Sequence, residues 1–236
     1  MQIKFFSKKG LFFLIAFAII VFIASKINFS TIIGAENQSF TFFQFFGPIA
    51  GGFLGPVFGA LSVLIAQASE FFLSGKAIEP INLLRLTPML FGAFYFGKYL
   101  QKKSLKDASL LVPLACMALF WLNPVGQQVW FYALYWLIPV FAKLFSKRLI
   151  ARSFGATFTA HAIGSTIWLY TVPMPAEAWI ALIPIVAIER TAFALGISIS
   201  YVGFNTFLSK VDSAFSTGLH IDKAYVFGKK MFRLNA

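Results

Sequence analysis

Charged residues are scarce in this chain: they make up 12% of its 236 residues, and only 8 residues are acidic. Soluble domains carry about 25% charged residues, so this composition excludes an ordinary soluble protein. Hydrophobic residues account for 59% of the chain, and Phe alone occurs 31 times. The sequence therefore predicts a membrane protein.

Cysteine and histidine are nearly absent. The single cysteine, Cys116, excludes a disulfide framework and a Cys-based metal site within one chain. Two histidines, His161 and His220, argue against a His-rich metal centre. The chain also lacks the HExxH, GxSxG and Walker A motifs and shows no GxGxxG after a strand. We therefore predict no catalytic residues, no metal, no cofactor and no enzyme activity.

Basic residues are distributed unevenly. Most of the 20 Lys and Arg residues lie in four short clusters separated by apolar segments. Cytoplasmic loops of membrane proteins hold an excess of Lys and Arg, so we expect all four clusters on the cytoplasmic side, against anionic lipid. This interpretation explains the net charge of +12 without nucleic-acid binding. The clusters are Lys4, Lys8 and Lys9; Lys98, Lys102, Lys103 and Lys106; Lys143, Lys147, Arg148 and Arg152; and Lys210, Lys223, Lys229, Lys230 and Arg233.

Apolar segments predict the membrane-spanning helices, each of which needs about 20 residues. The segment 40–73 is long for one crossing and short for two. If it crosses twice, all four basic clusters share one side of the membrane, and the polar connections 28–39, 74–82, 123–127 and 172–178 lie on the outer side. Pro lacks an amide hydrogen and Gly tolerates unusual dihedral angles, so we predict a hairpin turn at Gly55, Pro56 and Gly59. The other predicted spans are 10–27, 83–98, 108–122, 128–143, 154–171 and 179–208.

The predicted fold is all-α: a polytopic transmembrane bundle of about eight helices with both termini in the cytoplasm. Seven crossings is the alternative count. Residues 1–208 would form the transmembrane domain and 209–236 a basic cytoplasmic tail. The first 27 residues resemble a signal peptide, but the bulky Phe22 suits cleavage poorly. We therefore expect an uncleaved first helix and a protein of the cell (plasma) membrane.

Polar side chains inside apolar helices are costly and usually functional. Glu189 and Arg190 lie near the middle of the last predicted helix, with His161 at a similar depth in the preceding one. Glu189 is expected to contact either His161 or Arg190. Further polar residues would line the outer half of the bundle, which suggests a cavity for a small polar ligand. The predicted ligand-binding residues are Gln44, Gln67, Glu70, Asn82, Arg85, His161, Trp168, Glu189 and Arg190, with Gln127, Gln128 and Tyr170 as further candidates.

Structural explanations for the same residues stay open. The ionisable residues could form a buried ion pair that only fixes helix packing. The tryptophans could form interfacial belts at the membrane surface. This explanation applies to Trp130, Trp136, Trp168 and Trp179.

The stretch SFTFFQFFGPIAGGFLGPVFGALSVLIAQ has a Gly-Pro-x-x-Gly turn that opens a Gly/Ala-rich helix. It resembles the second and third helices of substrate-binding (S) components of energy-coupling factor (ECF) transporters. The segment 154–208 is similar to the last two helices of that family. The resemblance implies a six-helix core, to which 108–143 adds an inserted hairpin. It also implies capture of a micronutrient at the outer face, followed by toppling of the subunit when a coupling subunit and two ATPases engage it.

The resemblance also bears on partners and ligand. In the family, an Ala-xxx-Ala motif in the first helix contacts the coupling subunit, and this chain has Ala16, Ala18 and Ala24 without that spacing. Metal-binding S components usually use an N-terminal His, which does not follow Met1 here, so an organic micronutrient is favoured. The chain has no nucleotide-binding motif, so ATP hydrolysis would belong to its partners.

Two other function classes remain as alternatives. One is a polytopic membrane enzyme that acts on a lipid or isoprenoid, with Glu189, His161 and Arg190 as its polar centre. The other is a non-catalytic membrane assembly protein in which the same residues only hold helices together.

Overall fold

The computed structural model of this protein describes residues 8–31, 39–98, 108–145, 148–215 and 221–228. This part of the chain is mostly helical, which confirms the predicted all-α class. A small antiparallel ribbon joins β1 (Asn28–Thr31) to β2 (Ser39–Thr41), where the sequence predicts only a polar connection. Thr and Phe in both strands suit an extended, half-exposed ribbon.

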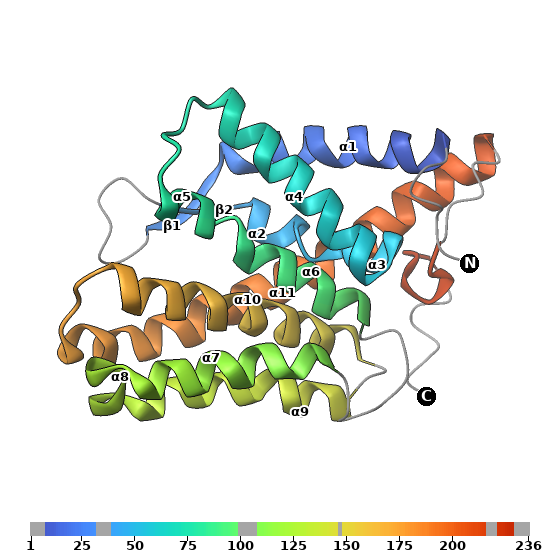
Figure 1. Ribbon diagram of the computed structural model, residues 1–236. Helices are drawn as coiled ribbons and strands as arrows, with labels where there is room; N and C mark the ends of the chain where they lie inside the picture. Colours follow the sequence, from blue (N-terminus) through green and yellow to red (C-terminus); the bar gives the residue numbers. More distant parts are fainter. Residues whose placement is uncertain (1–7, 32–38, 99–107, 146–147, 216–220, 229–236) are drawn as a thin grey trace.

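The helices of the first half pack together, with the ribbon at one end of them and the Gly-Pro turn between α3 and α4 at the other (Figure 1). They are α1 (Lys8–Ser25), α2 (Phe43–Phe46), α3 (Ile49–Leu54), α4 (Pro56–Leu73), α5 (Pro80–Leu84) and α6 (Thr87–Lys98). The second half consists of η1 (Ala108–Leu110), α7 (Leu111–Leu122), α8 (Pro124–Gln128), η2 (Trp130–Leu137), α9 (Ile138–Leu144), α10 (Leu149–Thr171), α11 (Ala176–Phe215) and η3 (Lys223–Tyr225).

The chain reverses direction at Gly55, between α3 and α4. Gly55 has a φ of 84°, in the region that favours glycine, and Pro56 begins α4. A side chain at Gly59 would collide with the backbone of Gly51, so the two helices are in close contact after the turn. All six residues of α3 are buried. Protein therefore surrounds the short helix, which is what the predicted transmembrane hairpin would require of its irregular backbone.

The elements that connect the helices gather at two ends of the bundle (Figure 1). The β1–β2 ribbon, α5 and α8 lie at one end, whereas α3 and η3 lie at the other. The sequence predicts 28–39, 74–82, 123–127 and 172–178 as segments on the outer side, and the described parts of these segments lie at the same end.

Several helices differ from the predicted spans. The predicted span 128–143 is divided into η2 and α9, because Pro139 near the start of α9 cannot donate a helical hydrogen bond. Helix α11 has 40 residues and continues through Phe215, beyond the predicted end at residue 208. Helices α6 and α7 have 12 residues each, fewer than the roughly 20 that cross a bilayer alone.

Within the described residues, two helices are long and apolar enough to cross a membrane: Pro56–Leu73 and Ala176–Val211. Shorter apolar helices are Leu14–Ser25, Phe43–Leu54, Leu111–Leu122 and Trp130–Leu144. Large apolar side chains on α11, such as Ile188, Ile199 and Phe207, are exposed on its outer face.

The interior contains two clusters of buried apolar side chains, and both include residues of α10 and α11. The first includes Phe53 and Tyr201, while the second includes Phe120, Trp136 and Trp179. Helix α10 contacts α6 on one side and α7, α9 and α11 on the others. The predicted inserted hairpin thus packs on α10 through its own aromatic cluster, and α10 becomes the central helix of the protein.

Candidate functional site

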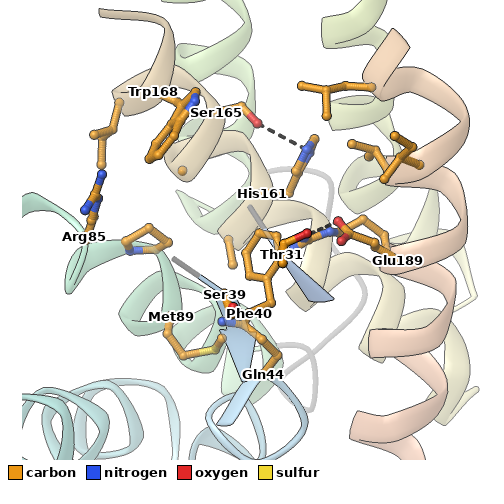
Figure 2. A pocket seen from close by; sticks show the side chains of 18 of the residues that line it. Thr31, Ser39, Phe40, Gln44, Arg85, Met89, His161, Ser165, Trp168 and Glu189 are labelled. Atoms are coloured by element: carbon orange, nitrogen blue, oxygen red, sulfur yellow. Dashed lines mark hydrogen bonds and ion pairs between the residues drawn. The ribbon is translucent and has the colours of Figure 1, made fainter. Parts of the chain in front are cut away.

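A cavity of about 300 Å³ lies among the β1–β2 ribbon, α2, α4, α6, α10 and α11 (Figure 2). Its walls are mostly apolar and aromatic, and a few polar side chains reach it from different elements. This combination is typical of sites for small organic ligands, whose volumes run from about 300 to 1,000 Å³. We call it the inner cavity.

A second cavity of about 470 Å³ adjoins the inner cavity. The two cavities share Ser39, Phe43, Gln67 and Arg85 in their walls. The second cavity extends to the end of α4 and to the segment that leads into α5. We call it the outer cavity.

The predicted ligand-binding residues lie in these two walls. The inner cavity is lined by Gln44, Gln67, Arg85, His161, Trp168, Glu189 and Arg190. The outer cavity is lined by Gln67, Glu70, Asn82 and Arg85. Three further candidates, Gln127, Gln128 and Tyr170, are exposed and line neither cavity.

His161 is held on both ring nitrogens. Trp136 Nε1 donates to His161 Nδ1 at 3.1 Å, and His161 Nε2 lies 3.1 Å from both Tyr132 Oη and Ser165 Oγ. The indole N–H can only donate, so Nδ1 accepts and the proton resides on Nε2. The side chain is therefore a neutral imidazole whose hydrogen-bonding groups are engaged by the protein.

Glu189 contacts Arg190 rather than His161. Glu189 Oε1 accepts from Ser30 Oγ at 2.6 Å, and Glu189 Oε2 lies 3.5 Å from Arg190 Nη2. The Arg190 guanidinium also lies against the rings of Phe40 and Phe193, at 4.6 and 4.5 Å from their centroids. The side chain of Arg190 is only 3% exposed, so these cation–π contacts are largely desolvated and correspondingly strong.

Arg85 provides a second cation at the boundary between the two cavities. Its guanidinium lies 5.0 Å from the ring centroid of Trp168, and Nη1 donates to Asn82 Oδ1 at 3.3 Å. Figure 2 shows Arg85 and Trp168 on one side of the inner cavity and Glu189 on the other. Trp168, one of the tryptophans that could belong to an interfacial belt, therefore lines the cavity and positions a charged side chain.

Four buried polar atoms in the inner wall have no hydrogen-bond partner among the described residues. They are Gln67 Oε1, Arg85 Nε, Trp179 Nε1 and Arg190 Nε. Buried polar groups in folded proteins are nearly always hydrogen-bonded, and an unmade bond there is destabilising. The side chains of the wall therefore carry three donors and one acceptor whose hydrogen bonds are unmade, and a small shift of these side chains would be needed to offer them to a ligand.

Glu70 closes a network at the edge of the outer cavity. Its carboxylate accepts from Lys76 Nζ and Ser74 Oγ at 2.8 Å each, and Lys26 Nζ lies 3.5 Å away. Lys26 follows α1, so the network joins the end of α1 to the end of α4. Both lysines are about half exposed, so the ion pairs contribute little stability. The role of Glu70 in the structure is to hold elements around the opening.

Several residues of the site are absent from the predicted set. Trp136 and Trp179 are 0% and 1% exposed, so the interfacial-belt explanation is wrong for both. Trp130, at 53% exposed, still fits that explanation. Tyr132 lines the inner cavity from the inserted hairpin, and its spacing from His161 in the sequence gives no sign of their contact.

The predicted partner-contact alanines are less exposed than the large apolar residues of α1. Ala24 is 4% exposed and Ala18 packs against the first core cluster. Ala16 is half-buried. The exposed apolar residues of α1 are Leu11, Ile15, Ile19, Phe22 and Ile23. Ala24 is therefore a core residue, and a partner on the outer face of α1 would meet the larger side chains instead.

No family model matches this chain, and no solved structure matches it. The chain is similar to an uncharacterized protein of Methanocaldococcus jannaschii, with 28% identity over 160 residues. The match covers 60% of this chain and 52% of the relative, so the chain spans about half the length of the protein that it matches. Any assignment of function therefore rests on the geometry of the two cavities.

Proposed function

We propose that this protein is the membrane-embedded substrate-capture subunit of an ECF-type transporter, which takes up a small polar micronutrient. The observation that supports this proposal most strongly is the convergence of seven predicted polar and aromatic residues on the inner cavity. In this proposal the protein itself performs no catalysis and holds no cofactor. A coupling membrane subunit and two ATPases would supply the energy.

The proposed topology places the ligand site on the outer half of the membrane. The eight apolar segments would cross the cell membrane alternately, with both termini in the cytoplasm. The inner cavity is lined by Thr31 and Ser39 of the β1–β2 ribbon, and the outer cavity by Lys76, Ala77 and Asn82 near α5. Both elements belong to segments expected on the outer side, so a ligand would enter from outside through the outer cavity.

The membrane-enzyme alternative receives less support from the geometry. A general base needs a free lone pair within reach of the substrate. Both ring nitrogens of His161 are engaged by Trp136, Tyr132 and Ser165. Glu189 has one contact on each carboxylate oxygen, with Ser30 and with Arg190. These contacts suit positioning of side chains around a bound molecule better than proton transfer.

The function is tested by native mass spectrometry of the tagged protein, purified from membranes in mild detergent. We expect a retained small molecule, co-purifying membrane and ATPase subunits, or both. A matched preparation of the Arg85→Gln variant should retain less of the small molecule and the same subunits. Recovery of the wild-type chain with neither a ligand nor a partner subunit would contradict the proposal.

The topology is tested by cysteine labelling in intact cells. In a Cys116→Ser background, a membrane-impermeant maleimide should label Ile78→Cys, because Ile78 is 71% exposed near the predicted outer end. The same reagent should not label Lys102→Cys or a cysteine at Lys4 until the membrane is opened. Labelling of Lys4→Cys and Lys102→Cys from opposite sides would overturn the eight-crossing arrangement. Lys4 and Lys102 lie outside the described residues.

A further inference from the structure

The unpaired polar atoms of the inner cavity specify the hydrogen-bonding character of its ligand. Three of them donate: Arg85 Nε, Trp179 Nε1 and Arg190 Nε. One of them, Gln67 Oε1, accepts. Arg190 and Trp179 are 3% and 1% exposed, so bulk water does not compete at these positions. A ligand that satisfies this wall is richer in acceptors than in donors.

The charges of the lining residues specify the sign of the ligand. The inner cavity is lined by two guanidinium groups, those of Arg85 and Arg190, and by one carboxylate, that of Glu189. His161 is a neutral imidazole, because its Nδ1 accepts from Trp136. Glu79 is exposed and does not line the cavity, although its charge acts on Arg85 from outside. Among the groups that line the cavity, the positive charges exceed the negative charges by one, and a single negative charge on the ligand would balance this excess.

Aromatic rings specify the shape of the ligand. Phe40, Phe43, Tyr132, Trp168 and Trp179 contribute to the wall of the inner cavity. Aromatic faces pack well against flat rings, in offset or edge-on arrangements. A volume of about 300 Å³ is at the lower end of the range for ligand sites, which favours a compact molecule.

We propose that the inner cavity binds a small, planar, aromatic monoanion, such as a heteroaromatic carboxylate, that also carries one donor for Gln67. The acidic group lies against Arg85, beside Trp168, and the ring lies among the aromatic side chains. This inference rests on the proposed function and names the class of substrate for that site.

The test uses three isosteric probes that differ in charge: benzoate, benzamide and benzamidine. Each is titrated against the full-length protein in detergent, and binding is followed by tryptophan fluorescence, since Trp168 and Trp179 line the cavity. We expect benzoate to bind at least about tenfold more tightly than neutral benzamide, which corresponds to about 1.4 kcal/mol. Cationic benzamidine should bind most weakly. Equal binding of the three probes, a preference for benzamidine, or no binding of benzoate would overturn the proposal.

Shape and residue identity are tested in the same assay. Cyclohexanecarboxylate, which has the charge of benzoate without its flat ring, should bind several-fold more weakly than benzoate. Arg85→Gln should weaken benzoate binding about tenfold or more, whereas Arg85→Lys should recover part of the loss. Arg148→Gln, which removes an exposed arginine, is the control and should leave binding unchanged. A similar loss in Arg148→Gln would contradict a specific role for Arg85.

Different experimental results would contradict the proposed substrate class and the proposed function. If native mass spectrometry finds a cationic or neutral ligand together with partner subunits, the proposed function stands and the anion proposal is overturned. If benzoate binds as expected but no partner subunit or transport is found, the anion site stands and the transporter proposal fails.

Discussion

Replacement of Gly51 by alanine is expected to destabilise the protein by about 3 kcal/mol, at the upper end of the usual cost of overpacking. Gly51 lies in α3, and a Cβ atom there would collide with the carbonyl of Ala93 in α6. The same atom would lie 2.9 Å from the amide nitrogen of Gly97. Both obstacles are backbone atoms, so no side-chain rotation can relieve the conflict.

The close contact around Gly51 involves three helices. A Cβ atom at Gly59 of α4 would collide with Gly51, and one at Gly97 of α6 would lie 2.7 Å from both the carbonyl of Gly51 and the nitrogen of Pro56. Small residues allow helices to approach closely inside a membrane, where the hydrophobic effect does not drive helices together. The turn between α3 and α4 therefore depends on the close approach of α3, α4 and α6 that these glycines allow.

Thermal unfolding in detergent measures this effect. For a chain of this length, 3 kcal/mol corresponds to a loss of roughly 6–12 °C in Tm. Gly203→Ala is the matched control, because a Cβ atom at Gly203 in α11 meets nothing within 4 Å. It should be neutral or gain up to about 1 kcal/mol from helix propensity. If Gly51→Ala unfolded at the temperature of Gly203→Ala, the close packing of α3 on α6 would be wrong.

Replacement of Arg190 by methionine is expected to destabilise the protein by about 3 kcal/mol. The change removes the guanidinium beside Glu189 Oε2 and leaves the carboxylate with only the hydrogen bond from Ser30. Removal of one partner from a buried ion pair typically costs about 3–5 kcal/mol, because the remaining charge is uncompensated. The cation–π contacts with Phe40 and Phe193 are lost as well.

A double-mutant cycle separates the charge effect from the packing effect. Glu189→Gln combined with Arg190→Met removes both charges and retains a side chain that can still accept from Ser30. The double variant should therefore be more stable than Arg190→Met alone, as judged by the thermal unfolding midpoint. Losses that simply add would show that the two side chains act independently, and the pair would then have no role in organising the cavity.

The turn at Gly55-Pro56 and the polar residues of the cavity could be predicted from local chemistry. A Gly-Pro pair inside a long apolar segment favours a break, and the turn is present at Gly55, whereas Gly47 and Pro48 of a second such pair keep helical dihedral angles. Polar residues such as Gln67, Arg85 and Glu189 are costly in an apolar helix unless they face a cavity or each other. All nine predicted ligand-binding residues line one of the two cavities.

Features that depend on packing between distant segments could not be predicted in this way. An indole ring suits both an interface and a protein interior, so the sequence alone does not distinguish Trp179, which is buried, from Trp130, which is exposed. The contacts of His161 with Tyr132 and Trp136 join α10 to the inserted hairpin. Such contacts depend on how the hairpin packs on α10, which local sequence patterns do not encode.

Arg85 and Gln67 belong to the walls of both cavities, and this has a consequence for how a molecule would travel inward. A ligand that first contacted the Arg85 guanidinium from the outer cavity, near Glu70, could keep that contact while the rest of the ligand moved into the inner cavity toward Glu189. The charged group of the ligand would then lose its water gradually, because Arg85 would pair with it throughout its movement between the two cavities. A molecule without a group that binds Arg85 would be excluded at the boundary between the two cavities, before it entered the inner cavity.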